Sequence, residues 1–113
     1  MQVLFPLPAF PDFVRYLERV KFLVLWRMEL TLLSRGMAAA VARMPEYAEP
    51  LERDGRVVAR YHLVGQHGGA WIYDVSSNEE LDRLLGMSPV YNLARYEVHA
   101  LAEMNPPDPG LTE

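Results

Sequence analysis

The sequence contains no cysteine, which excludes disulfides, thiolate metal sites and thiol nucleophiles. It also lacks a basic surplus: the net charge is −4 and the isoelectric point about 5.3, so nucleic acid is a poor partner. Apolar runs such as FLVLW at 22–26 are far shorter than the roughly 20 residues of a membrane helix. The first residues carry prolines and no basic region, unlike a signal peptide. We therefore expect a cytoplasmic protein that binds neither nucleic acid nor membrane.

The composition fits one globular domain with a modest core, because half of the 113 residues are hydrophobic and 23% are charged. Residues 1–21 are expected to form a proline-rich extension with a short helix that starts near Pro11. Residues 22–103 are expected to form the folded domain. Residues 104–113, which contain NPPDPG, are expected to be irregular.

Two alternating stretches joined by the glycine-bearing loop GQHGG predict a β-hairpin over residues 56–77. In the first stretch, RVVARYHLV, the apolar or aromatic positions that include Tyr61 alternate with Arg60 and His62. The second stretch, AWIYDVSS, places Trp71 on its apolar face. We therefore expect one face of the hairpin to pack against helices, with Arg60 and His62 on the opposite, charged face.

The remaining chain predicts two more strands and two helices. Alternation over residues 22–32 and 93–101 predicts the strands. Ser34 is a candidate N-cap for a helix that Pro45 and Pro50 divide into two pieces, and SNEELDRLLG predicts the second helix. This order predicts an α+β fold, the ferredoxin-like split βαβ sandwich, with a four-stranded antiparallel sheet and two helices on one face. Right-handed crossovers place the first and third strands in the centre.

Alternation also gathers aromatic residues on the helix-facing side of the predicted sheet. They are Trp26, Tyr61, Trp71, Tyr73 and Tyr96. These side chains form either a plain aromatic core or the floor of a pocket for a flat or polycyclic apolar ligand. Three buried tyrosine hydroxyls would each need a hydrogen-bond partner, which favours a partly hydrated cavity.

The opposite face of the sheet is predicted to be charged. Its members are Arg27, Glu29, Arg60, His62, Asp74, Arg95, Glu97 and His99. Such a face is either solvated or meets a second copy of the chain, with opposite charges pairing across the interface. We expect a homodimer or a higher homo-oligomer, and a catalytic role for this face is the alternative.

His67, which lies between glycines in the hairpin loop, is the first candidate for proton transfer. An imidazole ordinarily titrates near about pH 6.5, which suits acid–base work. A solvent-exposed loop histidine is the alternative reading. Glu46 in the first helix is the second candidate, and Tyr91 before the last strand is a candidate for ligand binding. The three histidines show no metal-ligand spacing, so no metal is expected.

Several short strings are spread over about two-thirds of the chain. They are a basic residue at Arg27, DGR at 54–56, the loop at Gly65, YDVSS at 73–77, the ELDRLL helix, and Pro89 before the last strand. Together they resemble the muconolactone delta-isomerase family, small α+β proteins that assemble as dimers or larger oligomers. The resemblance implies isomerisation of a lactone or enol-lactone by proton shuttling, without metal or organic cofactor.

The sequence departs from that family at two places. Met44 stands where an acidic residue is expected, with Glu46 nearby, and Tyr61 and His62 replace a tryptophan followed by an arginine. We expect a divergent, cofactor-free isomerase or cyclase for a small carbonyl or lactone compound, or for a larger polycyclic metabolite of secondary metabolism. His67 or Glu46 would move a proton α to a carbonyl.

The expected small-molecule substrate would contact a set of aromatic and basic side chains. They are Trp26, Arg27, Tyr61, His62, Trp71, Tyr73 and Tyr91. The alternative is a non-catalytic ligand-binding or assembly protein on the same dimeric α+β fold.

Overall fold

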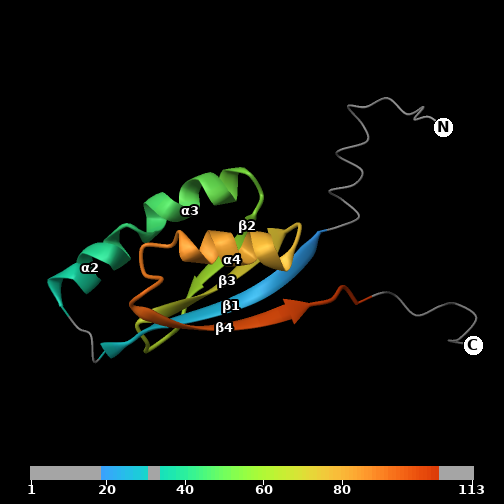
Figure 1. Cartoon of the computed structure of the whole chain (residues 1–113). Coiled ribbons are helices and arrows are strands. Elements are labelled where there is room, and N and C mark those ends of the chain that lie inside the picture. Colours follow the sequence, from blue (N-terminus) through green and yellow to red (C-terminus); the bar gives the residue numbers. More distant parts are fainter. Residues whose placement is uncertain (1–18, 31–33, 105–113) are drawn as a thin grey trace, which may run out of the picture.

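The computed structural model describes residues 19–30 and 34–104 of the chain, and shows an antiparallel sheet with its helices on one face (Figure 1). Its elements are β1 (Val20–Met28), α2 (Arg35–Ala42), α3 (Met44–Arg53), β2 (Val57–His62), β3 (Gly68–Val75), α4 (Asn78–Gly86) and β4 (Ala94–Leu101). The strand order is β2-β3-β1-β4, with β1 and β3 in the centre as predicted. The α+β, ferredoxin-like prediction is confirmed. The short helix expected near Pro11 lies outside the described residues.

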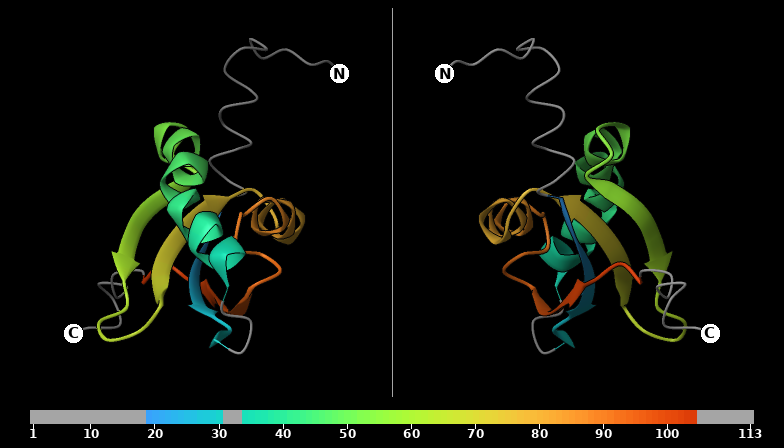
Figure 2. Two further views of the ribbon diagram at one scale, coloured as in Figure 1. Left: turned by 90° about the vertical axis from the view of Figure 1, so that its left-hand side faces the viewer. Right: turned by 90° about the vertical axis from the view of Figure 1, so that its right-hand side faces the viewer.

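The helices form one layer above the sheet, with α3 over β2 and α4 over β3 (Figure 2). The core lies between the layers. It includes Phe22, Val24, Ala48, Leu51, Val75, Leu81, Leu84 and Val90. None of the helices in the described part of the chain is long and apolar enough to cross a membrane.

The first helix is in two pieces, as predicted, but the break lies at Arg43 before Pro45, and Pro50, which was also predicted to interrupt the helix, lies inside α3. Ser34 caps α2, where its Oγ accepts a hydrogen bond from the N–H of Met37 at 3.2 Å. Arg43 separates α2 from α3, and Pro45 lies in the first turn of α3, where its missing N–H is not needed. Ser77 caps α4 in the same way, at 3.0 Å. Both serine caps therefore start the helices at the predicted places.

A β-bulge interrupts the pairing of β2 with β3. Val57 pairs with Tyr73, whereas Ala59 pairs with the neighbouring Ile72. Val58 is therefore an extra residue in β2, and it is half exposed. From this point onward, every residue of β2 lies on the face opposite to the one that simple alternation assigns.

Beyond the bulge, Arg60 pairs with Trp71 and His62 pairs with Gly69, which puts both side chains on the helix-facing side. Tyr61 lies on the other face and is 66% exposed. The prediction that Tyr61 faces the helices, with Arg60 and His62 opposite, is therefore wrong. Counting with a period of two assumes an unbroken ladder, and a shift of one residue exchanges the faces.

The other aromatic residues predicted on the helix-facing side do lie there. They are Trp26, Trp71, Tyr73 and Tyr96. The hydroxyl of Tyr73 lies 3.1 Å from that of Tyr47, and the hydroxyl of Tyr96 donates to Oγ of Ser88 at 3.2 Å. The two tyrosines of this group that pack towards the core therefore use protein partners for their hydroxyls.

The outer face of the sheet is less charged than predicted. Its centre is apolar and partly buried, and consists of Leu23, Leu25, Ala70 and Ile72. Charged side chains lie beside this apolar strip, where Arg27 pairs with Glu97 at 3.6 Å and Arg95 pairs with Glu29. His99 also contacts Glu97. The charged pairs therefore border the apolar strip on the side of β4.

Candidate functional site

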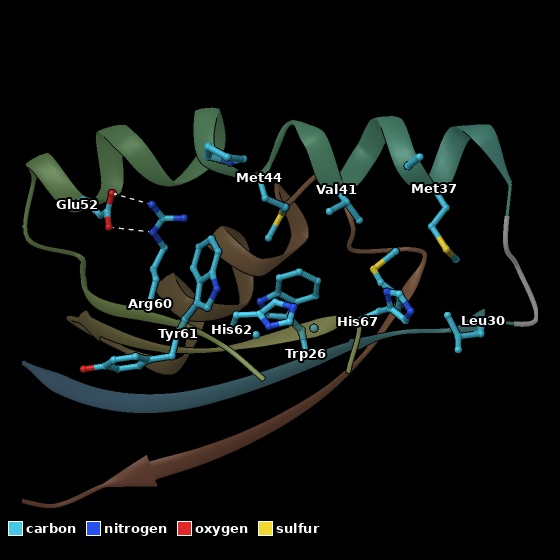
Figure 3. Close-up of a pocket in the computed structure, with 16 residues that line it drawn as sticks. Trp26, Leu30, Met37, Val41, Met44, Glu52, Arg60, Tyr61, His62 and His67 are labelled. Atoms are coloured by element: carbon cyan, nitrogen blue, oxygen red, sulfur yellow. Dashed lines mark hydrogen bonds and ion pairs between the residues drawn. The ribbon is translucent and has the colours of Figure 1, made fainter. Parts of the chain in front are cut away.

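A cavity of about 940 Å³ lies between the paired helices α2 and α3 and the sheet below them (Figure 3). The sheet contributes Trp26, Met28, Gly69 and Trp71 to its lining, and the helices contribute Met37, Val41 and Met44. Most of this surface is apolar, and methionine side chains adapt readily to different ligand shapes. The size and lining are typical of a small-molecule site.

Two glycines that were predicted in the hairpin loop belong to β3 and shape the cavity floor. A Cβ atom on Gly68 would lie 2.0 Å from the carbonyl oxygen of Trp26, so glycine is required for the close approach of β1 and β3. The carbonyl of His67 accepts the N–H of Met28 at 2.8 Å. This bond ties the loop to the end of β1 and holds His67 at the cavity.

His67, the first predicted acid–base candidate, lines the cavity, and the bulge brings His62 into the same lining (Figure 3). The two imidazoles come from opposite ends of the β2–β3 hairpin loop. In a neutral imidazole one ring nitrogen can accept a proton and the other carries one that it can donate. The tautomer decides which nitrogen has which role. Both histidines are exposed, as the alternative for His67 predicted, so the cavity holds two groups able to move protons at its open side, next to an apolar surface.

Arg60 closes one end of the cavity. Its guanidinium lies over the ring of Trp71, 5.2 Å from the ring centroid, and donates to both carboxylate oxygens of Glu52 at 2.9 and 3.4 Å. Because Glu52 belongs to α3 and Arg60 to β2, the ion pair links the helix layer to the sheet edge (Figure 3). Glu52 is the acidic residue among the described residues of the lining, and its charge is matched by Arg60.

The structure divides the predicted ligand-binding residues into two groups. Trp26, Trp71 and His62 line the cavity, and Tyr61 lies at its rim with its ring turned away from the helices (Figure 3). The lining does not include Arg27, Tyr73 or Tyr91, nor the acid–base candidate Glu46. The predicted site is therefore assembled in part.

Each residue outside the lining has a different surrounding. Arg27 lies on the outer face and donates to Oε1 of Gln66 at 2.8 Å. Tyr73 is buried in the core, and Tyr91 is 43% exposed, with its ring against Tyr96. Glu46 is an exposed residue of α3.

Some lining residues escaped the sequence reasoning. Met37, Val41 and Met44 follow one another at spacings of four and three, the interval of one helix face, and this signal was available. Arg60 had no usable signal, because the bulge that turns it inward is not visible in an alternating apolar string. No group of three or more His, Asp or Glu side chains that could hold a metal ion occurs within the described ranges.

Comparison with known proteins agrees with the geometry. The model of the family described as muconolactone delta-isomerase matches residues 20–106. A muconolactone delta-isomerase of Cupriavidus pinatubonensis is 34% identical over 86 residues, which cover 72% of this chain and 92% of that protein. The muconolactone delta-isomerase of Acinetobacter baylyi is 38% identical over 55 residues, which cover 49% of this chain and 57% of that protein.

The fold has a counterpart among solved structures. A crystal structure of muconolactone isomerase superposes with a TM-score of 0.65 at 22% identity, over 74% of this chain and 90% of the other. At this identity the superposition establishes the shared fold. Together with the family match over most of the chain, it leads to one assignment: this chain belongs to the muconolactone delta-isomerase family.

Proposed function

We propose that this protein is an isomerase that works without a cofactor and moves a proton α to the carbonyl of a lactone or related carbonyl compound. The observation that carries the proposal is that His62 and His67 line the same largely apolar cavity as two indole rings. Proton transfer needs an ionisable group within reach of the ligand and walls that exclude water. The names of the relatives support the same class of reaction.

The size of the cavity supports a substrate larger than a single small ring. About 940 Å³ is near the upper end of the range for drug-sized ligands, and flat rings suit a floor built from Trp26 and Trp71. We therefore favour a polycyclic or aryl-substituted lactone.

In the proposed mechanism His67 acts as the base and His62 returns the proton. The imidazole of His67 takes a proton from the carbon next to the carbonyl, and the electrons of the broken C–H bond spread over the enolate. His62, which starts as an imidazolium in this mechanism, then gives a proton to another carbon of the conjugated system, and proton exchange with water returns His67 and His62 to their starting states. The double bond moves, the atoms and charges balance, and no oxidant or reductant is consumed.

The experiment that tests the proposal follows proton exchange in deuterated water by NMR, with muconolactone and an aryl-substituted butenolide as probes. We expect His67→Ala to lower the exchange rate by about 10²-fold or more, the usual contribution of a general base. His62→Ala should slow it less. His99→Ala is the matched control, because this histidine lies on the outer face and pairs with Glu97.

Glu46→Gln separates the two acid–base candidates that the sequence suggested. Since Glu46 lies outside the lining, we expect it to leave the exchange rate within about two-fold of wild type. Exchange that survives both histidine substitutions would contradict the proposal. Binding of the butenolide without any exchange would favour the alternative, a non-catalytic ligand-binding protein.

We also propose that two copies of the chain meet through the outer face of the sheet. The apolar strip of Leu23, Leu25, Ala70 and Ile72 is covered by no element in the described part of the chain. Both signs of charge lie beside the strip, so a two-fold arrangement allows cations of one copy to meet anions of the other.

A further inference from the structure

Two indole nitrogens lie close to one point of the cavity floor. Trp26 on β1 and Trp71 on β3 have ring centroids 6.3 Å apart and ring planes at 79°. The Trp26 side chain is 8% exposed, and its Nε1 has no hydrogen-bond partner within the described structure. Buried donors of this kind are rare in native proteins, because leaving one unpaired is costly.

Gly69 marks this point of the cavity floor. It is the register partner of Trp26 and lines the cavity. A Cβ atom at Gly69 would lie 2.8 Å from Nε1 of Trp26 and 2.9 Å from Nε1 of Trp71. Glycine is therefore required here, because the two indole nitrogens already occupy the room that a side chain would need, and both lie against the bare backbone of Gly69, which lines the cavity.

The charges around this part of the cavity floor favour an oxygen acceptor that carries negative charge. The described polar groups of the lining are nitrogen-bearing side chains, apart from Tyr61 at the rim and Glu52. Glu52 is held by Arg60, so its charge is already compensated. An anionic ligand oxygen at the floor would thus meet donors and no free carboxylate.

We infer that the indole N–H groups of Trp26 and Trp71 form an oxyanion-binding pair, which holds the carbonyl oxygen of the substrate while it becomes an enolate. The inference rests on the proposed function and names the groups that stabilise its intermediate. When His67 removes the proton, the C–H electrons move to the carbonyl oxygen, and the two donors receive the new charge. Reprotonation at carbon returns the oxygen to a neutral carbonyl. Preorganised donors aimed at developing charge are among the strongest contributions to catalysis.

Access to the donor on Trp26 requires a side chain to move. Its Nε1 is itself buried, and Met44 points from α3 towards the indole (Figure 3). Met28 and Met44 both line the cavity. Methionine has three rotatable bonds and repacks easily, so a ligand ring can displace these side chains without disturbing the backbone.

The first test uses the fact that the chain contains two tryptophans, so an indole ¹H–¹⁵N spectrum shows two side-chain resonances. Trp71→Phe assigns them. The probe is 4-nitrophenolate, whose charged oxygen resembles an enolate, and 4-nitroanisole is the matched neutral control. We expect both indole protons to shift downfield with the phenolate and not with the anisole.

The outcomes are distinct. If the Trp26 proton instead resonates upfield and does not respond, its N–H points at the ring of Trp71 and the inference is overturned. Movement of the Trp71 resonance alone also overturns the pair. The same holds if neither resonance moves, whether the phenolate stays outside the cavity or binds elsewhere.

The second test is kinetic and separates this inference from the proposed function. Trp26→Phe and Trp71→Phe each remove one N–H and keep a ring, so we expect kcat for proton exchange to fall by about 10²-fold or more with KM little changed. If wild type exchanges protons and neither variant is slowed, the inference fails while the proposed function stands. If wild type shows no exchange but both indoles respond to the phenolate, the proposed function fails while the oxyanion-binding pair stands.

Discussion

The hydroxyl of Tyr47 on α3 lies 3.1 Å from the hydroxyl of Tyr73 on β3 and donates to the carbonyl of Leu84 on α4 at 2.7 Å. A hydroxyl has one proton to give, so Tyr73 is the donor within the tyrosine pair. The chain of two hydrogen bonds links the helices α3 and α4 to the central strand β3 beneath them. Tyr47 also stacks against Trp71, with ring centroids 6.0 Å apart, so the same contact supports the cavity floor.

The two tyrosines should respond unequally to loss of their hydroxyls. Tyr47→Phe leaves the buried hydroxyl of Tyr73 without an acceptor, and we expect a loss of about 1–3 kcal/mol in the free energy of unfolding. Tyr73→Phe removes a donor while Tyr47 keeps its bond to Leu84, so we expect about 1 kcal/mol or less. Urea unfolding of both variants measures the difference. Equal losses of unfolding free energy in the two variants would show that the hydrogen bond of the pair does not run from Tyr73 to Tyr47.

Alkaline pH should weaken the fold through the same tyrosines. Burial raises the pKa of Tyr47 to about 12, against the effect of its hydrogen bond from Tyr73, and burial also raises the pKa values of Tyr73 and Tyr96. An unfolded tyrosine titrates near about 10. Between these values the unfolded chain has lost the protons that the folded chain keeps, so the free energy of unfolding falls as the pH rises. Their stabilising contribution is fully present below a pH of about 10.

Urea titrations on either side of that pH provide the measurement. Wild type should lose stability as the pH rises through this window. The double variant Tyr47→Phe with Tyr73→Phe should lose clearly less, because it has fewer buried hydroxyls to ionise. If the free energy of unfolding fell equally with pH in wild type and the double variant, the loss of stability could not be assigned to Tyr47 and Tyr73.

Gly68→Ala should be strongly destabilising, because its Cβ would meet the backbone carbonyl of Trp26 at 2.0 Å and neither strand can yield without breaking the ladder. We expect a loss of about 3 kcal/mol, at the upper end for overpacked sites. Gly86→Ala is the control: no atom lies within 4 Å of its Cβ position, at the end of α4. Gly86→Ala should raise the free energy of unfolding by about 0.4–1 kcal/mol. Thermal unfolding compares the two, and similar melting temperatures would refute the close approach.

Ile72→Asp should disrupt assembly, because it places a charge in the centre of the apolar strip on the outer face. By light scattering we expect wild type above the 12.9 kDa of one chain and Ile72→Asp at that mass, with an unchanged circular dichroism spectrum. Val64→Asp is the control, since Val64 is 94% exposed in the hairpin loop. A wild type that stays monomeric at micromolar concentration would exclude the interface.

Much of the fold was predictable because its signals are local. Ser34 and Ser77 mark the helix starts, Pro45 marks the break, and alternation in β1 and β4 assigns faces correctly. The first strand was predicted to run to residue 32, because apolar residues continue that far in the sequence. The strand pairing, and β1 with it, ends at Met28.

The candidate site was only partly predictable, because it depends on one non-local irregularity. The string RVVARYH alternates well, and nothing in it shows that Val58 will bulge; the register with β3 decides it. That one residue moves Arg60 and His62 into the cavity and turns Tyr61 out. His67, by contrast, was predicted to lie at the site because it stands between Gly65 and Gly68 in the hairpin loop.

The bulge also bears on how a family of this kind diversifies. If the bulge were straightened with every residue of β2 kept, Val58 would pair with Ile72, so Tyr61 would turn towards the helices while Arg60 and His62 turned outward, with the strand order unchanged. A change that straightens the bulge would therefore exchange a charged wall of the cavity for an aromatic one. Such a step changes three lining residues at once and leaves the opposite, helical wall of methionines intact.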